Sequence, residues 1–119
     1  FGGAMRQTGH YAAAALHGVA QHRARLADDH ANARALAEAI APCLGVRLDL
    51  ATVMTNIVVF HLEPGRPDLP DAPALVARAR ERGVLLNAFG PRTVRAVTHL
   101  DVDAAQVRQA AAVLVALLG

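Results

Sequence analysis

The stretch TNIVVFHL, residues 55–62, decides the fold class of this chain. Its side chains alternate in direction if it is a strand, and both resulting faces are apolar. Ile57 and Val59 share one face, while Val58 and Phe60 share the other. A strand that is apolar on both faces is typical of the centre of a sheet, so we predict a central strand buried on both sides.

Helical and extended patterns surround this strand. Before it, an apolar periodicity over residues 7–41 predicts helix, with a stripe of Tyr11, Ala15, Leu16, Val19 and Ala20 continued by Leu26, Ala33, Ala37 and Ile40. Gly18 and the polar QHR at 21–23 favour a break into two helices. GVRLDL (45–50) alternates like a short strand.

The second half of the chain carries clear helix caps and a turn. We predict a helix from the N-cap Asp71 to about Arg82, with Gly83 as its C′ residue, and a last helix opened by a capping box of Asp103 and Gln106. The buried stripe of that last helix is Val107, Ala111, Leu114 and Leu118. Between the helices, two strands over 84–88 and 94–99 are joined by a turn at FGPR.

These elements predict an α/β fold, a two-layer α+β sandwich. We expect a sheet of three to four mostly antiparallel strands with helices packed on one face, which would bury all the stripes. With 119 residues the chain is one domain. It begins without a methionine, in a segment typical of a loop, and we expect it to be a fragment of a longer protein.

Composition excludes several classes of function. All twelve basic side chains are arginines scattered among ten acids, and only four residues are Phe or Tyr, so we expect no nucleic-acid binding. There is no signal peptide and no uncharged apolar run of about 18 residues, so we expect a soluble protein without a membrane partner. The single cysteine, Cys43, fits a reducing cytoplasm and a buried structural thiol.

Metal binding is not expected. The six histidines lack the spacings of three or four that a metal site on a helix requires. The acidic segment DDHANAR (28–34) is better interpreted as a solvated helix face with surface pairs Arg25–Asp29 and Arg34–Glu38. Gly2 and Gly3, before a helix, are at most a weak anion site to which Arg6 would add charge.

Two charged residues stand out on the predicted strand 94–99. Arg95 and His99 share one face with Val97, at a separation of roughly 13 Å, which is too far for one catalytic pair. The planar guanidinium of Arg95 matches a carboxylate or phosphate in bidentate geometry. The alternative is that Arg95 faces solvent in a weak surface ion pair.

Three segments resemble the C-terminal part of the low-specificity L-threonine aldolases. They are FGGAMRQTG (1–9), LADDHANARALAEAIA (26–41) and FGPRTVRAVTHLDVD (89–103). That family belongs to the β-eliminating lyases, pyridoxal-phosphate enzymes with the aspartate aminotransferase-type (fold-type I) fold, of which this would be the small C-terminal domain. Its opening usually reads Gly-Gly-Gly-Met-Arg-Gln, and Ala4 here replaces the last glycine. The Thr-Asn at residues 55–56 also fits.

The resemblance implies roles for single residues. Arg95 matches the arginine that holds the α-carboxylate of the substrate. Arg6 matches an arginine near pyridoxal phosphate, contributed across a subunit interface, and His99 matches a family histidine to which we assign no role. No catalytic residue is expected in this chain. The chain has no lysine to attach the cofactor, so by itself we expect it to be inactive.

The implied function is cleavage of threonine-like β-hydroxy-α-amino acids to glycine and an aldehyde, in a cytoplasmic homo-oligomer, a tetramer for the complete enzyme. We expect residues 1–20 to form an interdomain loop and helix and residues 21–119 the small domain. Two alternatives stay open. One is a non-catalytic α/β module for regulation or oligomerisation, and the other is a lyase for a different β-substituted amino acid.

Overall fold

The computed structural model describes residues 5–65 and 71–119. The helices are α1 (Thr8–His17), the π-helical turn η1 (Gly18–His22), α2 (Leu26–Ile40), the 3-10 turn η2 (Leu50–Thr52), α3 (Ala72–Glu81) and α4 (Ala104–Leu118). The strands are β1 (Val46–Arg47), β2 (Ile57–Leu62), β3 (Asn87–Ala88) and β4 (Thr93–Val97). The expected α/β class is confirmed.

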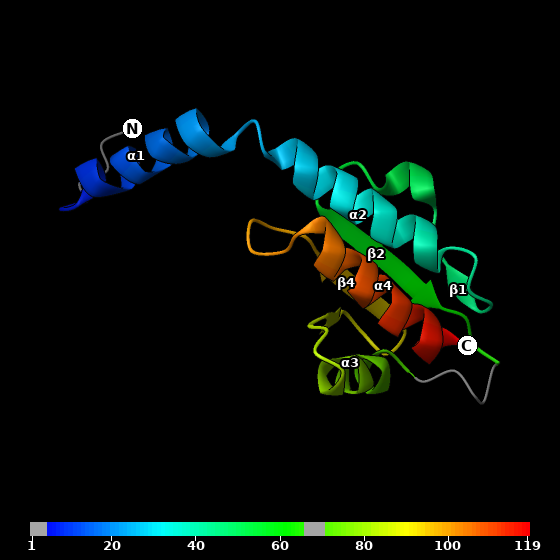
Figure 1. Cartoon of the computed structure of the whole chain (residues 1–119). Coiled ribbons are helices and arrows are strands. Elements are labelled where there is room, and N and C mark those ends of the chain that lie inside the picture. The colour runs from blue at the N-terminus through cyan, green and yellow to red at the C-terminus, as the bar shows by residue number, and fades with distance from the viewer. Residues whose placement is uncertain (1–4, 66–70) are drawn as a thin grey trace.

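The four strands form one antiparallel sheet in the order β1-β2-β4-β3. The helices α2 and α4 lie side by side across one face of it (Figure 1). Between sheet and helices lies the core, whose largest members are Phe60, Ile40, Leu62, Leu75, Leu114, Leu118, Val58 and Val94. The strand at residues 57–62 is therefore central, as predicted.

One prediction about this strand is wrong. Val58, Phe60 and Leu62 are buried, but Ile57 and Val59 on the opposite face retain 39% and 41% of their exposure. The reason is that α2 and α4 cover a single face, and none of the described helices crosses the other (Figure 1). We call this uncovered surface the open face of the sheet.

The break predicted from Gly18 and residues 21–23 is present, but the backbone stays helical through Gly18 and η1, and α1 is separated from α2 by the turn at residues 23–25. The stripe that follows the break is largely buried through Ala33, Ala37 and Ile40. The stripe of α1 is not buried, contrary to expectation, and Tyr11, Leu16 and Val19 are all exposed. The helix projects away from the sheet, so no described strand and neither α2 nor α4 covers its apolar stripe (Figure 1).

The predicted caps are confirmed. The carboxylate of Asp71 accepts a hydrogen bond from the amide of Ala74 at 2.8 Å. Asp103 and Gln106 form the reciprocal capping box at the start of α4. The four residues expected on the buried stripe of α4 are the four that are buried. No helix in the described part of the chain is long and apolar enough to cross a membrane.

The strands are shorter than predicted. Only Asn87–Ala88 of the predicted strand 84–88 pairs with β4, and β4 ends at Val97 rather than at His99. Beyond Val97 the amide of Thr98 still donates to the carbonyl of Asn56 at 2.9 Å. On the other edge of β4, a cavity of about 390 Å³ opens between residues 82–86 and residues 96–99. The segment before β3 thus leaves the sheet.

Candidate functional site

The open face of the sheet carries the candidate site. The strand register places its side chains in three cross-strand rows. The first row is Arg47, His61 and Thr93, the second is Val59, Arg95 and Asn87, and the third is Ile57 and Val97. The face is therefore polar and cationic at one end and apolar at the other.

Arg95 occupies the centre of this face on β4, with Val59 and Asn87 as its cross-strand neighbours. Its guanidinium carbon lies 5.5 Å from the centroid of the Phe89 ring. Its Nε is buried and has no hydrogen-bond partner among the described residues. No acid within residues 5–65 and 71–119 forms an ion pair with it, so the weak surface pair of the alternative interpretation does not occur there.

His61 and Thr93 form a polar pair next to Arg95. The Nδ1 of His61 lies 3.0 Å from the Oγ1 of Thr93, within hydrogen-bond distance. Because His61 is two residues beyond Val59, which opposes Arg95, it is a diagonal neighbour of the arginine. Sequence reasoning counted His61 only among the histidines without metal spacing. The alternation of the central strand could have placed it, but only once the pairing register was known.

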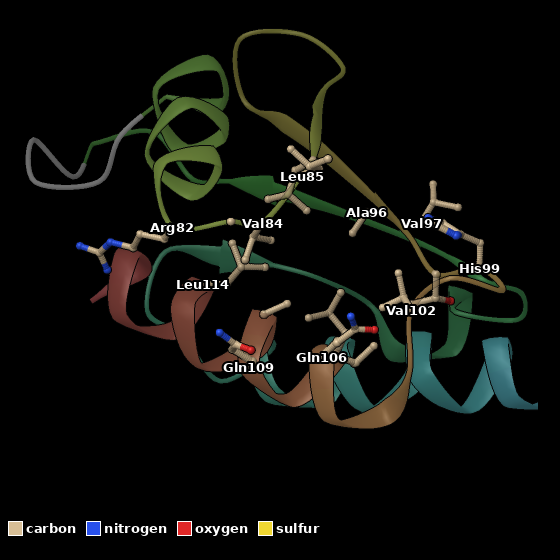
Figure 2. Close-up of a pocket in the computed structure, with 16 residues that line it drawn as sticks. Arg82, Val84, Leu85, Ala96, Val97, His99, Val102, Gln106, Gln109 and Leu114 are labelled. Carbon is tan, nitrogen blue, oxygen red and sulfur yellow. The ribbon is translucent and has the colours of Figure 1, made fainter.

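His99 is not on the strand, contrary to expectation. It lies after the end of β4, where its Nδ1 accepts a hydrogen bond from the amide of Asp101 at 3.3 Å. It lines the 390 Å³ cavity together with Gln106 and Val102, and its place at one end of the cavity is visible in Figure 2. Strand alternation therefore gives no reason to group His99 with Arg95.

Arg6 lies apart from Arg95. It is exposed and precedes α1, the helix that projects from the sheet (Figure 1). The structure therefore does not bring the two arginines together within one copy of the chain. The proposed anion contact at Gly2 and Gly3 lies outside the described residues.

The polar residues around the end of β4 have a structural role. The hydroxyl of Thr98 donates to the carbonyl of Asp29 in α2 at 2.7 Å, and the side-chain amide of Asn56 donates to the carbonyl of Thr98 at 2.6 Å. The side-chain amide of Asn32 donates to the carbonyl of Val102 at 3.3 Å. The bonds to Asp29 and Asn32 attach the turn after β4 to α2, on the side of the sheet opposite the open face, and the bond from Asn56 joins it to the segment before β2.

The expected solvated face of α2 needs one correction. Asp29 is 3% exposed rather than solvated, and its carboxylate lies 3.6 Å from the guanidinium of Arg25. The helix turns this residue toward the segment after β4, where its carbonyl meets Thr98. The pair Arg34–Glu38 is exposed as expected, at 2.7 Å, and Arg34 also donates to the carbonyl of Leu50.

Cys43 is half-buried and packs against the core, and burial raises the pKa of its thiol. That combination fits a structural thiol rather than a nucleophile. Within the described ranges, no three His, Cys, Asp or Glu side chains gather closely enough to hold a metal ion.

Fold and site define the class of this protein: an antiparallel α/β domain with helices on one face and, on the other, an arginine that forms no ion pair with the described residues. The chain belongs to the beta-eliminating lyase family, whose model matches residues 1–63. It is 37% identical over 111 residues to the low specificity L-threonine aldolase of Escherichia coli K12, covering 93% of this chain and 30% of that protein.

Plant proteins give a similar picture. Low-specificity L-threonine aldolase 1 of Arabidopsis thaliana is 33% identical over 106 residues, which is 89% of this chain and 29% of that protein. The probable low-specificity L-threonine aldolase 2 of the same plant is 34% identical over 107 residues. The chain thus spans about three tenths of the length of the curated relatives it matches.

Proposed function

We propose that this chain is the C-terminal part of a pyridoxal-phosphate-dependent lyase that cleaves threonine-like β-hydroxy-α-amino acids to glycine and an aldehyde. In this proposal Arg95 binds the α-carboxylate of the substrate. The observation that carries it is the guanidinium itself, which lies on a central strand without an acid or hydrogen-bond partner among the described residues. A fork held on a rigid strand can orient a carboxylate through two parallel hydrogen bonds.

The residues of this chain do not fit as an attachment site for the cofactor, because the chain contains no lysine. Pyridoxal phosphate, when bound, supplies the electron sink for the bond cleavage. We therefore assign its covalent attachment to residues outside this chain and expect the chain alone to be inactive. Arg6, which is exposed at the far end of α1, would contact the cofactor of a neighbouring subunit.

Replacement of Arg95 tests the proposal in the protein encoded by the complete gene. Arg95→Lys keeps the charge but loses the fork, and Arg95→Ala loses both. Charge-assisted hydrogen bonds contribute about 1.5–3 kcal/mol, so we expect kcat/KM for threonine to fall roughly 10- to 100-fold in either variant. Arg78→Lys on the exposed surface of α3 is the control and should leave kcat/KM unchanged. Activity within threefold of wild type in both Arg95 variants would refute the role.

The same assay separates the two alternatives. A lyase for a different β-substituted amino acid would depend on Arg95 equally, because the α-carboxylate is common to all such substrates, and a substrate panel would identify it. A non-catalytic module would show no cleavage of any member of the panel.

We also propose that the complete protein is a homo-oligomer assembled through α1. The exposed apolar side chains of Tyr11 and Leu16 in α1 and of Val19 in the adjoining η1 support this, since exposed apolar patches mark contact surfaces. Leu16→Glu should lower the oligomer mass measured by light scattering. Arg23→Glu beyond the helix is the control, and an unchanged mass for Leu16→Glu would contradict the proposal.

A further inference from the structure

Phe89 lies against Arg95 on the open face of the sheet. We propose that Phe89 is a positioning residue, whose ring face holds the guanidinium of Arg95 so that its two terminal nitrogens remain free for a carboxylate. This inference rests on the proposed function of Arg95 and deepens it.

The strand register brings the two side chains together. Asn87 opposes Arg95 in the pairing of β3 with β4, and Phe89 is two residues beyond Asn87, so it points to the same face. It is a diagonal neighbour of Arg95, at a separation that aromatic and long side chains can span. The distance of 5.5 Å from the guanidinium carbon to the ring centroid is within the range of a cation–π interaction.

The backbone of Phe89 is fixed by the turn that it begins. Its amide donates to the carbonyl of Thr93 at 2.7 Å, which closes the turn between β3 and β4. Gly90 has a φ of +125°, a conformation that favours glycine. The turn is attached to α3, because the amide of Ala72 donates to the carbonyl of Pro91 at 2.9 Å. The ring is therefore presented to Arg95 by a constrained loop.

The ring of Phe89 is placed to orient the guanidinium of Arg95. The buried Nε of Arg95 donates no hydrogen bond, so polar contacts from the described residues do not set the orientation of the group. The face of an aromatic ring attracts a guanidinium cation. A guanidinium held against the ring has fewer orientations open to it, so the direction of its outer nitrogens is restricted. Phe89 itself is 67% exposed and does not belong to the core, so packing stability does not explain its position.

Kinetics of the protein encoded by the complete gene test the role. Phe89→Leu removes the ring face and keeps an apolar side chain, while Phe89→Tyr keeps the face. We expect Phe89→Leu to raise KM for threonine about two- to fivefold with kcat nearly unchanged. The separate variant Phe89→Tyr should have the same KM as the wild type. In the Arg95→Ala background, Phe89→Leu should have no further effect on kcat/KM.

A second readout needs no activity. In the 119-residue chain, the Nε–Hε resonance of Arg95 should exchange slowly with water in the wild type and in Phe89→Tyr, and faster in Phe89→Leu. An unchanged exchange rate and an unchanged KM in Phe89→Leu would overturn the inference, as would an equal effect of Phe89→Leu with and without Arg95. If Arg95→Ala itself left kcat/KM unchanged, the proposed function would fail first. If Arg95→Ala abolished activity while Phe89→Leu did nothing, only the role of Phe89 would fail.

Discussion

Replacing Thr98 with valine tests the attachment of β4 to the helix layer. Valine has nearly the shape of threonine, so the substitution deletes a hydroxyl from a side chain that is 3% exposed and leaves the packing in place. The lost donor reaches the carbonyl of Asp29 at 2.7 Å and, at 3.3 Å, the carbonyl of Asn56.

The loss of unfolding free energy in Thr98→Val depends on whether the carbonyls of Asp29 and Asn56 keep another hydrogen-bond donor. The carbonyl of Asp29 lies inside α2, where it also accepts the amide four residues ahead. The carbonyl of Asn56 keeps the amide of Thr98 at 2.9 Å. Neither oxygen loses its only partner, so the cost lies at the low end of the range for a lost hydrogen bond, about 1 kcal/mol in the free energy of unfolding.

Urea denaturation followed by circular dichroism measures this cost. Thr98→Val should lower the midpoint by roughly 0.5 M, for a slope of about 2 kcal/mol/M, without changing the slope. Thr98→Ser keeps the hydroxyl and loses a methyl group, at a cost of about 1 kcal/mol, and Thr98→Ala should cost about the sum of both. Thr55→Val is the control, because its exposed hydroxyl accepts, among the described residues, only a long bond of 3.3 Å from the amide of Ile57. A Thr98→Val chain as stable as wild type would refute the assigned role of the hydroxyl.

Three further predictions concern a cap, a core residue and the thiol. Asp103→Ala removes the acceptor for the amides of Ala105 and Gln106 and should cost about 1 kcal/mol of unfolding free energy, whereas Asp103→Ser should recover most of it; equal losses would argue against capping. Leu114→Ala opens a cavity in the fully buried centre of α4 and should cost about 2–5 kcal/mol by thermal unfolding, while the half-buried Leu117→Ala should cost less; the reverse order would contradict the packing. The raised pKa of Cys43 leaves less thiolate at neutral pH, so iodoacetamide should alkylate this thiol more slowly in the folded chain than in urea. The difference between the two alkylation rates should become smaller as the pH rises. Equal rates at neutral pH would contradict the burial of the thiol. Because the pKa of this thiol is higher in the folded than in the unfolded chain, its ionisation should lower the free energy of unfolding only at alkaline pH, above the pKa of the unfolded thiol.

Features that depend on neighbouring residues in the chain were predictable from the sequence. The N-caps Asp71 and Asp103, the break near Gly18 and the buried stripe of α4 follow from hydrogen bonds and spacings within one element, and all are present. The alternation of TNIVVFHL, with apolar residues on both faces at 57–60, correctly predicts a strand inside the sheet.

Features that depend on what lies across the fold were not predictable. The periodicity of Tyr11, Leu16 and Val19 indicates a helix face that needs a partner, but it carries no information on whether that partner is in the same chain. The same limit applies to Ile57 and Val59, whose apolar character was mistaken for burial. The spacing of four between Arg25 and Asp29 predicts a solvated surface pair, whereas the burial of Asp29 depends on the segment after β4, which is distant in the sequence.

The site was predictable only in part. The alternation of β4 places Arg95 on a face away from the helices, which is correct, but the diagonal contact with Phe89 and the neighbouring His61–Thr93 pair require the register between three strands. Beyond the end of β4 at Val97, hydrogen bonds join Thr98 to Asn56 and to Asp29, and no local sequence pattern predicts these long-range partners. The function of Arg95 stays a prediction.

The projecting helix α1 has a thermodynamic consequence. A helix of ten residues without buried side chains is marginal in water, because the cost of nucleation is spread over few hydrogen bonds. Its helical population should therefore rise whenever another surface covers Tyr11, Leu16 and Val19, and part of the binding free energy would be spent on ordering it. Amide exchange in α1, compared with the sheet, then becomes a direct gauge of how much of that contact has formed.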